Sequence, residues 1–109
     1  MDVVIDKVEE FIEKKELKKK ELVSITLKLT IKSEKDKVLA AGVDVDGLEM
    51  IEATRIALKK GENVFEFDPI KIFREFNSSG VVEPRKYKFT IAFVFGGDKS
   101  IVYDHIATF

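Results

Sequence analysis

The sequence predicts an all-β domain built as a two-sheet antiparallel β-sandwich. Residues 23–32 and 87–95 alternate between apolar and polar side chains, which is the pattern of strands that bury one face. Turn signals recur roughly every 8–15 residues, a spacing typical of sandwiches. The chain has 109 residues, enough to bury a core, so we expect residues 1–109 to form a single domain.

The composition is that of a globular protein with no strong electrostatic preference. Hydrophobic residues make up 45% of the chain, and 19 basic against 20 acidic residues leave a net charge of −1. We therefore expect neither nucleic acid nor a membrane as a partner. The absence of Cys excludes disulfides and thiolate chemistry. The Lys- and Glu-rich composition resembles that of thermophile proteins.

The sequence contains no recognisable targeting segment. Its start, MDVVIDKVEE, lacks the basic and apolar regions of a secretory signal. No apolar stretch approaches the length of about 20 residues that a membrane-spanning helix needs. We expect a cytoplasmic protein, although a piece of a longer exported protein would show the same pattern.

Residues 1–22 permit two interpretations, an N-terminal helix or the first strand of the sandwich. Val4, Val8, Phe11 and Ile12 form a helical stripe that favours the helix. The segment DVVID could equally be a first strand followed by a polar connection, and both interpretations stay open.

The next segments are predicted as strands separated by polar turns. Residues 23–32 place Val23, Ile25, Leu27, Leu29 and Ile31 on one face. Residues 38–45 alternate in the same way and run into the turn signal Asp46-Gly47. Two further strands, near 50–58 and 63–67, flank the sequence KKGEN, although the first of them also contains residues that suit a helix.

Residues 69–76 predict a short helix or 3₁₀ turn. Asp68 can cap it, Pro69 suits the first helical position, and Ile72, Phe73 and Phe76 follow helical spacing. The Ser-Ser-Gly sequence after Asn77 then predicts a polar loop.

The chain ends in a predicted hairpin around Gly96-Gly97-Asp98. Pairing Phe95 with Ile101 keeps Asp104 out of the core, so we prefer this register over a one-residue slip. The inward set of the last strand is then Ile101, Tyr103, His105, Ala107 and Phe109. We expect the face formed by Phe89, Ile91 and Phe93 to pack against that formed by Ile25, Leu27 and Leu29.

The order of these parts resembles the immunoglobulin-like and fibronectin type III-like β-sandwiches. The resemblance covers residues 20–109 and rests on the segments VSITLKLTI, LKKGENVFEF and VVEPRKYKFTIAFV. Pro84 precedes Tyr87 by three residues, much as in the tyrosine corner of that superfamily. The chain departs from the pattern because it has no Trp and no Cys pair. The resemblance implies a fold and no chemistry.

The candidate chemical groups do not assemble into a catalytic, cofactor or metal site. His105 is the only His, and its neighbour Asp104 lies on the opposite face of the strand. Asp44 and Asp46, with Glu49 or Glu52, offer oxygen ligands but not the spacing of a calcium loop. The Lys-rich residues 14–20 contain no Arg or aromatic residue, so we interpret them as a solvated segment. We expect no enzyme activity and no cofactor.

The last strand is the main functional lead. Residues 101–109 carry Asp104 as their one formal charge, so at a sheet edge they would be weakly protected against pairing with another chain. The predicted interaction edge is Ile101, Tyr103, His105, Ala107 and Phe109. We expect a non-catalytic interaction or assembly module that binds a protein partner or a second copy. The alternatives are that the N-terminal segment covers this edge, or that the protein is a small-ligand or carbohydrate-binding module.

Overall fold

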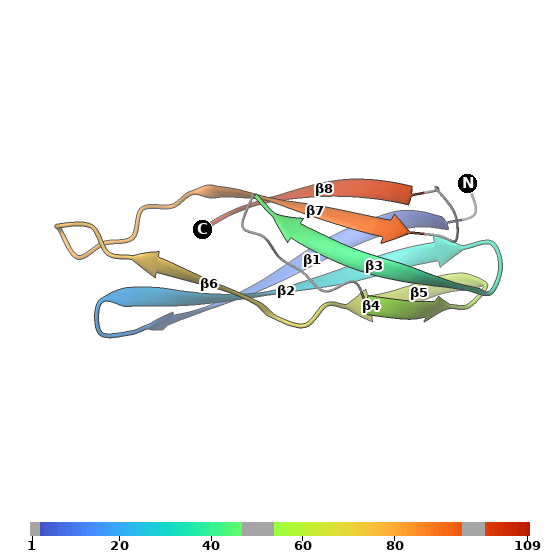
Figure 1. Cartoon of the computed structure of the whole chain (residues 1–109), viewed down its shortest axis with the longest axis horizontal. Helices are drawn as coiled ribbons and strands as arrows, with labels where there is room; N and C mark the ends of the chain where they lie inside the picture. The colour runs from blue at the N-terminus through green and yellow to red at the C-terminus, as the bar shows by residue number, and fades with distance from the viewer. Residues whose placement is uncertain (1–2, 47–53, 95–99) are drawn as a thin grey trace.

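A computed structural model describes residues 3–46, 54–94 and 100–109. These residues form two antiparallel sheets and contain no helix (Figure 1). The molecule is elongated, with principal extents of 53 × 24 × 18 Å. The strands are β1 (Val3–Glu16), β2 (Lys20–Ser33), β3 (Lys37–Val45), β4 (Thr54–Leu58), β5 (Gly61–Glu66), β6 (Ile70–Glu75), β7 (Lys86–Val94) and β8 (Ser100–Thr108).

The first sheet, here called sheet A, is organised around β2. One side of β2 pairs with β1 along its whole length. The other side pairs with β6 over residues 20–25 and with β5 over residues 28–33. The second sheet, sheet B, has the order β4-β3-β7-β8, so β4 and β8 are its two edges.

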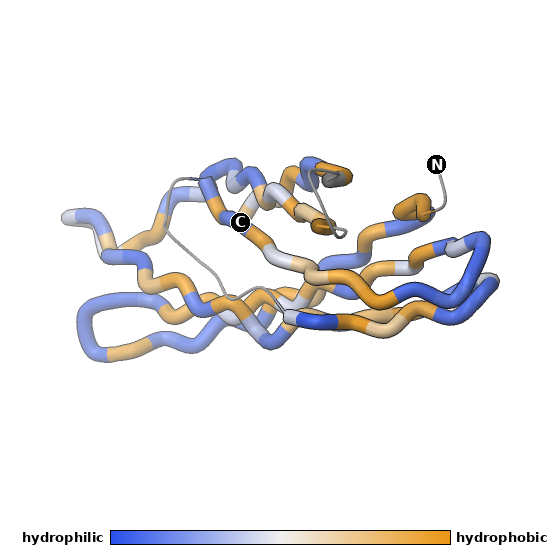
Figure 2. The backbone as a smooth tube through the Cα atoms, turned by 45° about the vertical axis from the view of Figure 1, so that its right-hand side comes forward, coloured by the Kyte–Doolittle hydropathy of each residue, from blue (hydrophilic) through white to orange (hydrophobic). Residues whose placement is uncertain are grey.

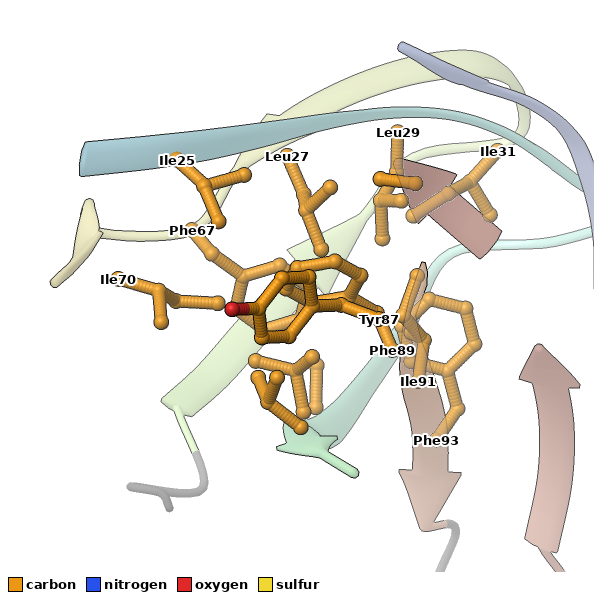
Figure 3. Close-up of a cluster of buried hydrophobic side chains, with 14 of the residues drawn as sticks. Ile25, Leu27, Leu29, Ile31, Phe67, Ile70, Tyr87, Phe89, Ile91 and Phe93 are labelled. Atoms are coloured by element: carbon orange, nitrogen blue, oxygen red, sulfur yellow. The ribbon is translucent and has the colours of Figure 1, made fainter. Parts of the chain in front are cut away.

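The core lies between the two sheets, as the alternating segments predict. Leu27, Leu29, Phe89, Ile91 and Phe93 have no exposed surface. Figure 3 shows the side chains of β2 pointing across the interior toward those of β7. Hydrophilic residues occupy the turns between strands at both ends of the molecule (Figure 2). The predicted packing of these two faces is confirmed.

Of the two interpretations left open for residues 1–22, the structure shows the first strand and not the helix, because Val3–Glu16 forms β1. A β-bulge at Asp6 places one extra residue between Ile5, opposite Ile31, and Lys7, opposite Thr30. The bulge lengthens the spacing between the inward residues Ile5 and Val8 to three, which imitates a helical repeat. The alternation is also obscured because Glu10 faces His105 on the inner side, whereas Val4 and Phe11 are about half exposed on the outer face.

The short helix at residues 69–76 was a wrong prediction, because Ile70–Glu75 is strand β6. Its buried positions are Ile70, Ile72 and Arg74, which alternate with exposed residues. Because the charged residue Arg74 occupies one of the inward positions, the sequence does not show a simple alternation of apolar and polar residues. Main-chain pairing with the free side of β2 at residues 20–25 stabilises the extended conformation.

The remaining strands agree in type with the sequence prediction and differ in detail. Residues 50–53 of the predicted 50–58 strand lie outside the described residues. In the C-terminal hairpin, Ile101 pairs with Phe93 rather than with Phe95, which also lies outside the described residues. The shift is two residues, so the faces are preserved and Asp104 is exposed as expected.

Removing the centre of the core should destabilise the fold strongly. We expect Leu27→Ala to lower the free energy of unfolding by about 2–5 kcal/mol, because Leu27 is fully buried. The adjacent Lys28 points to the opposite face, so Lys28→Ala should change stability by less than about 0.5 kcal/mol. Urea unfolding measures both, and equal losses in the two variants would contradict the assigned faces.

Candidate functional site

Among the residues that the structure describes, no strand pairs with the outer edge of β8, and the register identifies the main-chain groups that point outward. Arg85 and Phe109 exchange both main-chain hydrogen bonds, at 2.8 and 3.1 Å. Such bonded pairs recur at every second residue of an antiparallel ladder. The odd-numbered residues of β8 therefore bond to β7, and the N–H and C=O groups of Val102, Asp104, Ile106 and Thr108 face away from the sheet.

This geometry revises the predicted interaction edge. The predicted residues Ile101, Tyr103, His105 and Ala107 all use their main-chain groups in the ladder with β7, and the main chain of Phe109 is bonded to Arg85. The side chains of Ala107 and Phe109 belong to the buried core. A strand added to β8 would therefore bond to the even-numbered residues, with the predicted residues lining the inner side of the contact.

β8 is the least protected of the sheet edges in the described part of the chain. It spans nine residues, and its register with β7 contains no bulge. At the opposite edge of sheet B, β4 has only five residues. In sheet A, β1 carries a bulge and many charges, and β5 and β6 have six residues each. Bulges, short edges and charges are the usual protections against pairing with another chain.

The outward side chains of β8 are mainly apolar. Val102 is 59% exposed and Ile106 is 52% exposed. Asp104 lies between them, and its carboxylate accepts a hydrogen bond of 3.0 Å from the Thr90 hydroxyl. Within the described residues, Asp104 has no ion pair, so its charge is available to a partner.

Strand β1 lies beside β8 without forming a ladder with it among the described residues. The two strands meet through side chains, with His105 Nε2 3.1 Å from Glu10 Oε1. His105 and Glu10 are 17% and 32% exposed. The sequence analysis did not identify Glu10 as a partner, because the contact joins residues 95 positions apart. β1 thus approaches the inner side of β8 and leaves its main-chain edge unpaired.

An apolar cleft opens between the beginnings of β1 and β8. Its volume is about 260 Å³, and it is lined by Val3, Val4, Ile5, Ile101 and Tyr103. Tyr103 is 38% exposed at this position. The cleft adjoins the inner side of the free edge, where side chains of an added strand would lie.

A buried cation closes the opposite end of the sandwich. Arg74 is 8% exposed, lies 2.6 Å from Glu21, and donates a hydrogen bond to the main-chain oxygen of Phe109. Its guanidinium also contacts the Phe109 ring, which stacks on Tyr87 at 4.3 Å between centroids. Arg74 therefore joins β2, β6 and the end of the chain, so we assign it a structural role.

The other polar candidates are dispersed. Asp46 forms an ion pair of 3.1 Å with Arg85, and Asp44 is exposed on the outer face of β3. Glu49 and Glu52 lie outside the described residues. No group of three or more His, Asp or Glu side chains suited to a metal occurs in the parts of the chain that the structure describes. The same parts contain no helix long and apolar enough to cross a membrane.

Exposed aromatic side chains occur, but they do not form a platform. Phe11 and Phe73 are both about half exposed on the outer face of sheet A. They lie on opposite sides of β2, opposite Thr26 and Leu22, respectively. Lys20 covers the Phe73 ring at 4.7 Å. This arrangement gives no specific support to the carbohydrate-binding alternative.

Comparison of the chain with protein-family models, curated proteins and solved structures found no match. The candidate site is therefore defined by its geometry: an unpaired strand edge beside an apolar cleft.

Breaking the Arg74–Glu21 pair should destabilise the protein. We expect Arg74→Ala to lower the free energy of unfolding by about 2–4 kcal/mol, because it leaves the carboxylate of Glu21, 18% exposed, without its cation. Replacing both partners, as Arg74→Met with Glu21→Leu, should recover most of the loss. Denaturant unfolding of the single and double variants tests this, and a double variant less stable than Arg74→Ala would contradict it.

Proposed function

We propose that this protein is a non-catalytic interaction module that binds a protein partner by strand addition at β8. The observation that carries the proposal is the weakly protected nine-residue edge, along which the main-chain groups of the even-numbered residues point outward. Strand addition supplies affinity through main-chain hydrogen bonds and specificity through alternate side chains. The edge and the adjoining cleft provide both elements.

The proposal includes an immunoglobulin-like arrangement of the sandwich. In that superfamily, strands A, B and E share one sheet, and C′, C, F and G can share the other. The orders β1-β2-β5 and β4-β3-β7-β8 correspond to these two sets. Tyr87 lies at the start of β7, the strand that corresponds to F, which supports the tyrosine-corner resemblance. The additional pairing of β6 with β2 departs from this arrangement.

Proline at an outward position should block binding while preserving the fold. The Ile106 N–H faces away from β7, so Ile106→Pro removes a donor that only an added strand would use. The Ala107 N–H lies in the ladder, and Ala107 is buried, so Ala107→Pro should cost about 1–3 kcal/mol or more in stability. Thermal melting of both variants checks this difference.

Binding itself can be tested with a photo-reactive side chain at position 102, in cells of the source organism. We expect cross-linked adducts that Ile106→Pro abolishes, and none of these adducts from the same group at position 30 on the outer face of sheet A. Adducts that persist in a folded Ile106→Pro variant would contradict strand addition.

A further inference from the structure

The cleft and Asp104 together specify the side chains of the added strand. This inference rests on the proposed strand addition and concerns the chemistry of the partner. A strand bonded to the outward groups of β8 would continue its alternation of faces. Its inward side chains would lie beside Ile101 and Tyr103, and its outward ones beside Val102, Asp104 and Ile106.

The inward position next to Tyr103 favours an apolar side chain. Tyr103 and Ile101 form one wall of the 260 Å³ cleft, and Val3, Val4 and Ile5 form the other. All five lining residues present largely apolar surface, and Val4 and Tyr103 are still partly exposed to solvent. An aliphatic side chain inserted here would remove that surface from water.

The outward position opposite Asp104 favours a cation. Asp104 is an acceptor held by Thr90 and has no ion pair among the described residues. Thr90 also pairs with Asp44 on its other side, and Lys88 of β7 lies on the same face in the adjacent row, opposite Ile106. Opposite charges on directly facing strand positions stabilise the pairing.

A second copy of β8 does not satisfy this requirement. The sequence SIVYDHIAT of β8 contains no Lys or Arg, so self-pairing brings neither cation to Asp104. The symmetric register about residue 104 would place two Asp104 carboxylates opposite each other, which is destabilising. The charge pattern therefore favours a strand from a different protein.

From this geometry, we propose that β8 binds an extended segment of another protein in which Lys or Arg faces Asp104 and the adjacent inward residue is aliphatic. Apolar residues face Val102 and Ile106. In the antiparallel orientation, the segment is apolar, unspecified, basic, aliphatic, apolar, aliphatic in sequence order, from the position opposite Ile106 to that opposite Ile101.

The experiment titrates ¹⁵N-labelled protein with the synthetic peptide Gly-Val-Thr-Lys-Ile-Val-Leu-Gly at low salt. We expect shifts of the Val102, Asp104 and Ile106 amide signals. Changing the peptide Lys to Glu should weaken binding about 3- to 10-fold. The Asp104→Lys protein should instead bind the Glu peptide more tightly than the Lys peptide. Changing the peptide Ile to Ser should weaken binding about 10-fold or more, because the cleft loses its apolar contact.

The outcomes separate this inference from the proposed function. Edge-specific binding that ignores the peptide charge in both protein forms would overturn the partner chemistry and leave strand addition intact. Concentration-dependent dimerisation at the same amides, without peptide binding, would identify a second copy instead and also overturn the inference. If these amides respond to no peptide and to no change in protein concentration, and position 102 gives no adduct in cells, strand addition itself is wrong.

Discussion

The packing of β2 against β7 is the interaction on which the rest of the structure depends. The inward residues of both strands are almost completely removed from water. Both strands are also central in their sheets, so each is committed to neighbours along both of its sides. In sheet B, β7 pairs with β3 on one side and with β8 on the other, and no further strand pairs with β8 among the described residues, so β8 is an edge. The candidate site thus adjoins one of the two strands that carry the core.

The sequence predicted those parts of the fold in which side-chain alternation is uninterrupted. Residues 23–32 and 87–94 contain no inward charge and no extra residue, so local pattern and final structure agree. The pattern failed at β1, where the bulge at Asp6 interrupts it, and at β6, where Arg74 faces inward. In both cases, a distant partner determines the conformation: the long ladder with β2 for β1, and β2, Glu21 and Phe109 for β6.

The strand that forms the candidate site was predictable from the sequence, but its outward main-chain groups and the adjoining cleft were not. The sandwich prediction allowed the last strand to lie at a sheet edge, and low charge indicated that residues 101–109 would then be weakly protected; β8 is the last strand of sheet B. Which main-chain groups point outward depends on the phase of the ladder with β7. Side-chain alternation shows which side chains face inward, but it does not show which N–H and C=O groups bond to β7. The sequence analysis therefore named the odd-numbered residues. The cleft required β1 to lie beside β8, which is a relation between the two ends of the chain.

Because of its bulge, β1 contains one residue more than its ladder with β2 requires. Loss of Asp6 would make the ladder regular, with Ile5 and Val8 still directed to the interior. Loss of Lys7 would have the same result, because Asp6 could take its place opposite Thr30. Strand β2 has no such spare residue, so a single deletion there would exchange the buried and solvated faces of everything that follows within the strand. The two strands of this hairpin therefore differ in how their lengths can change during evolution.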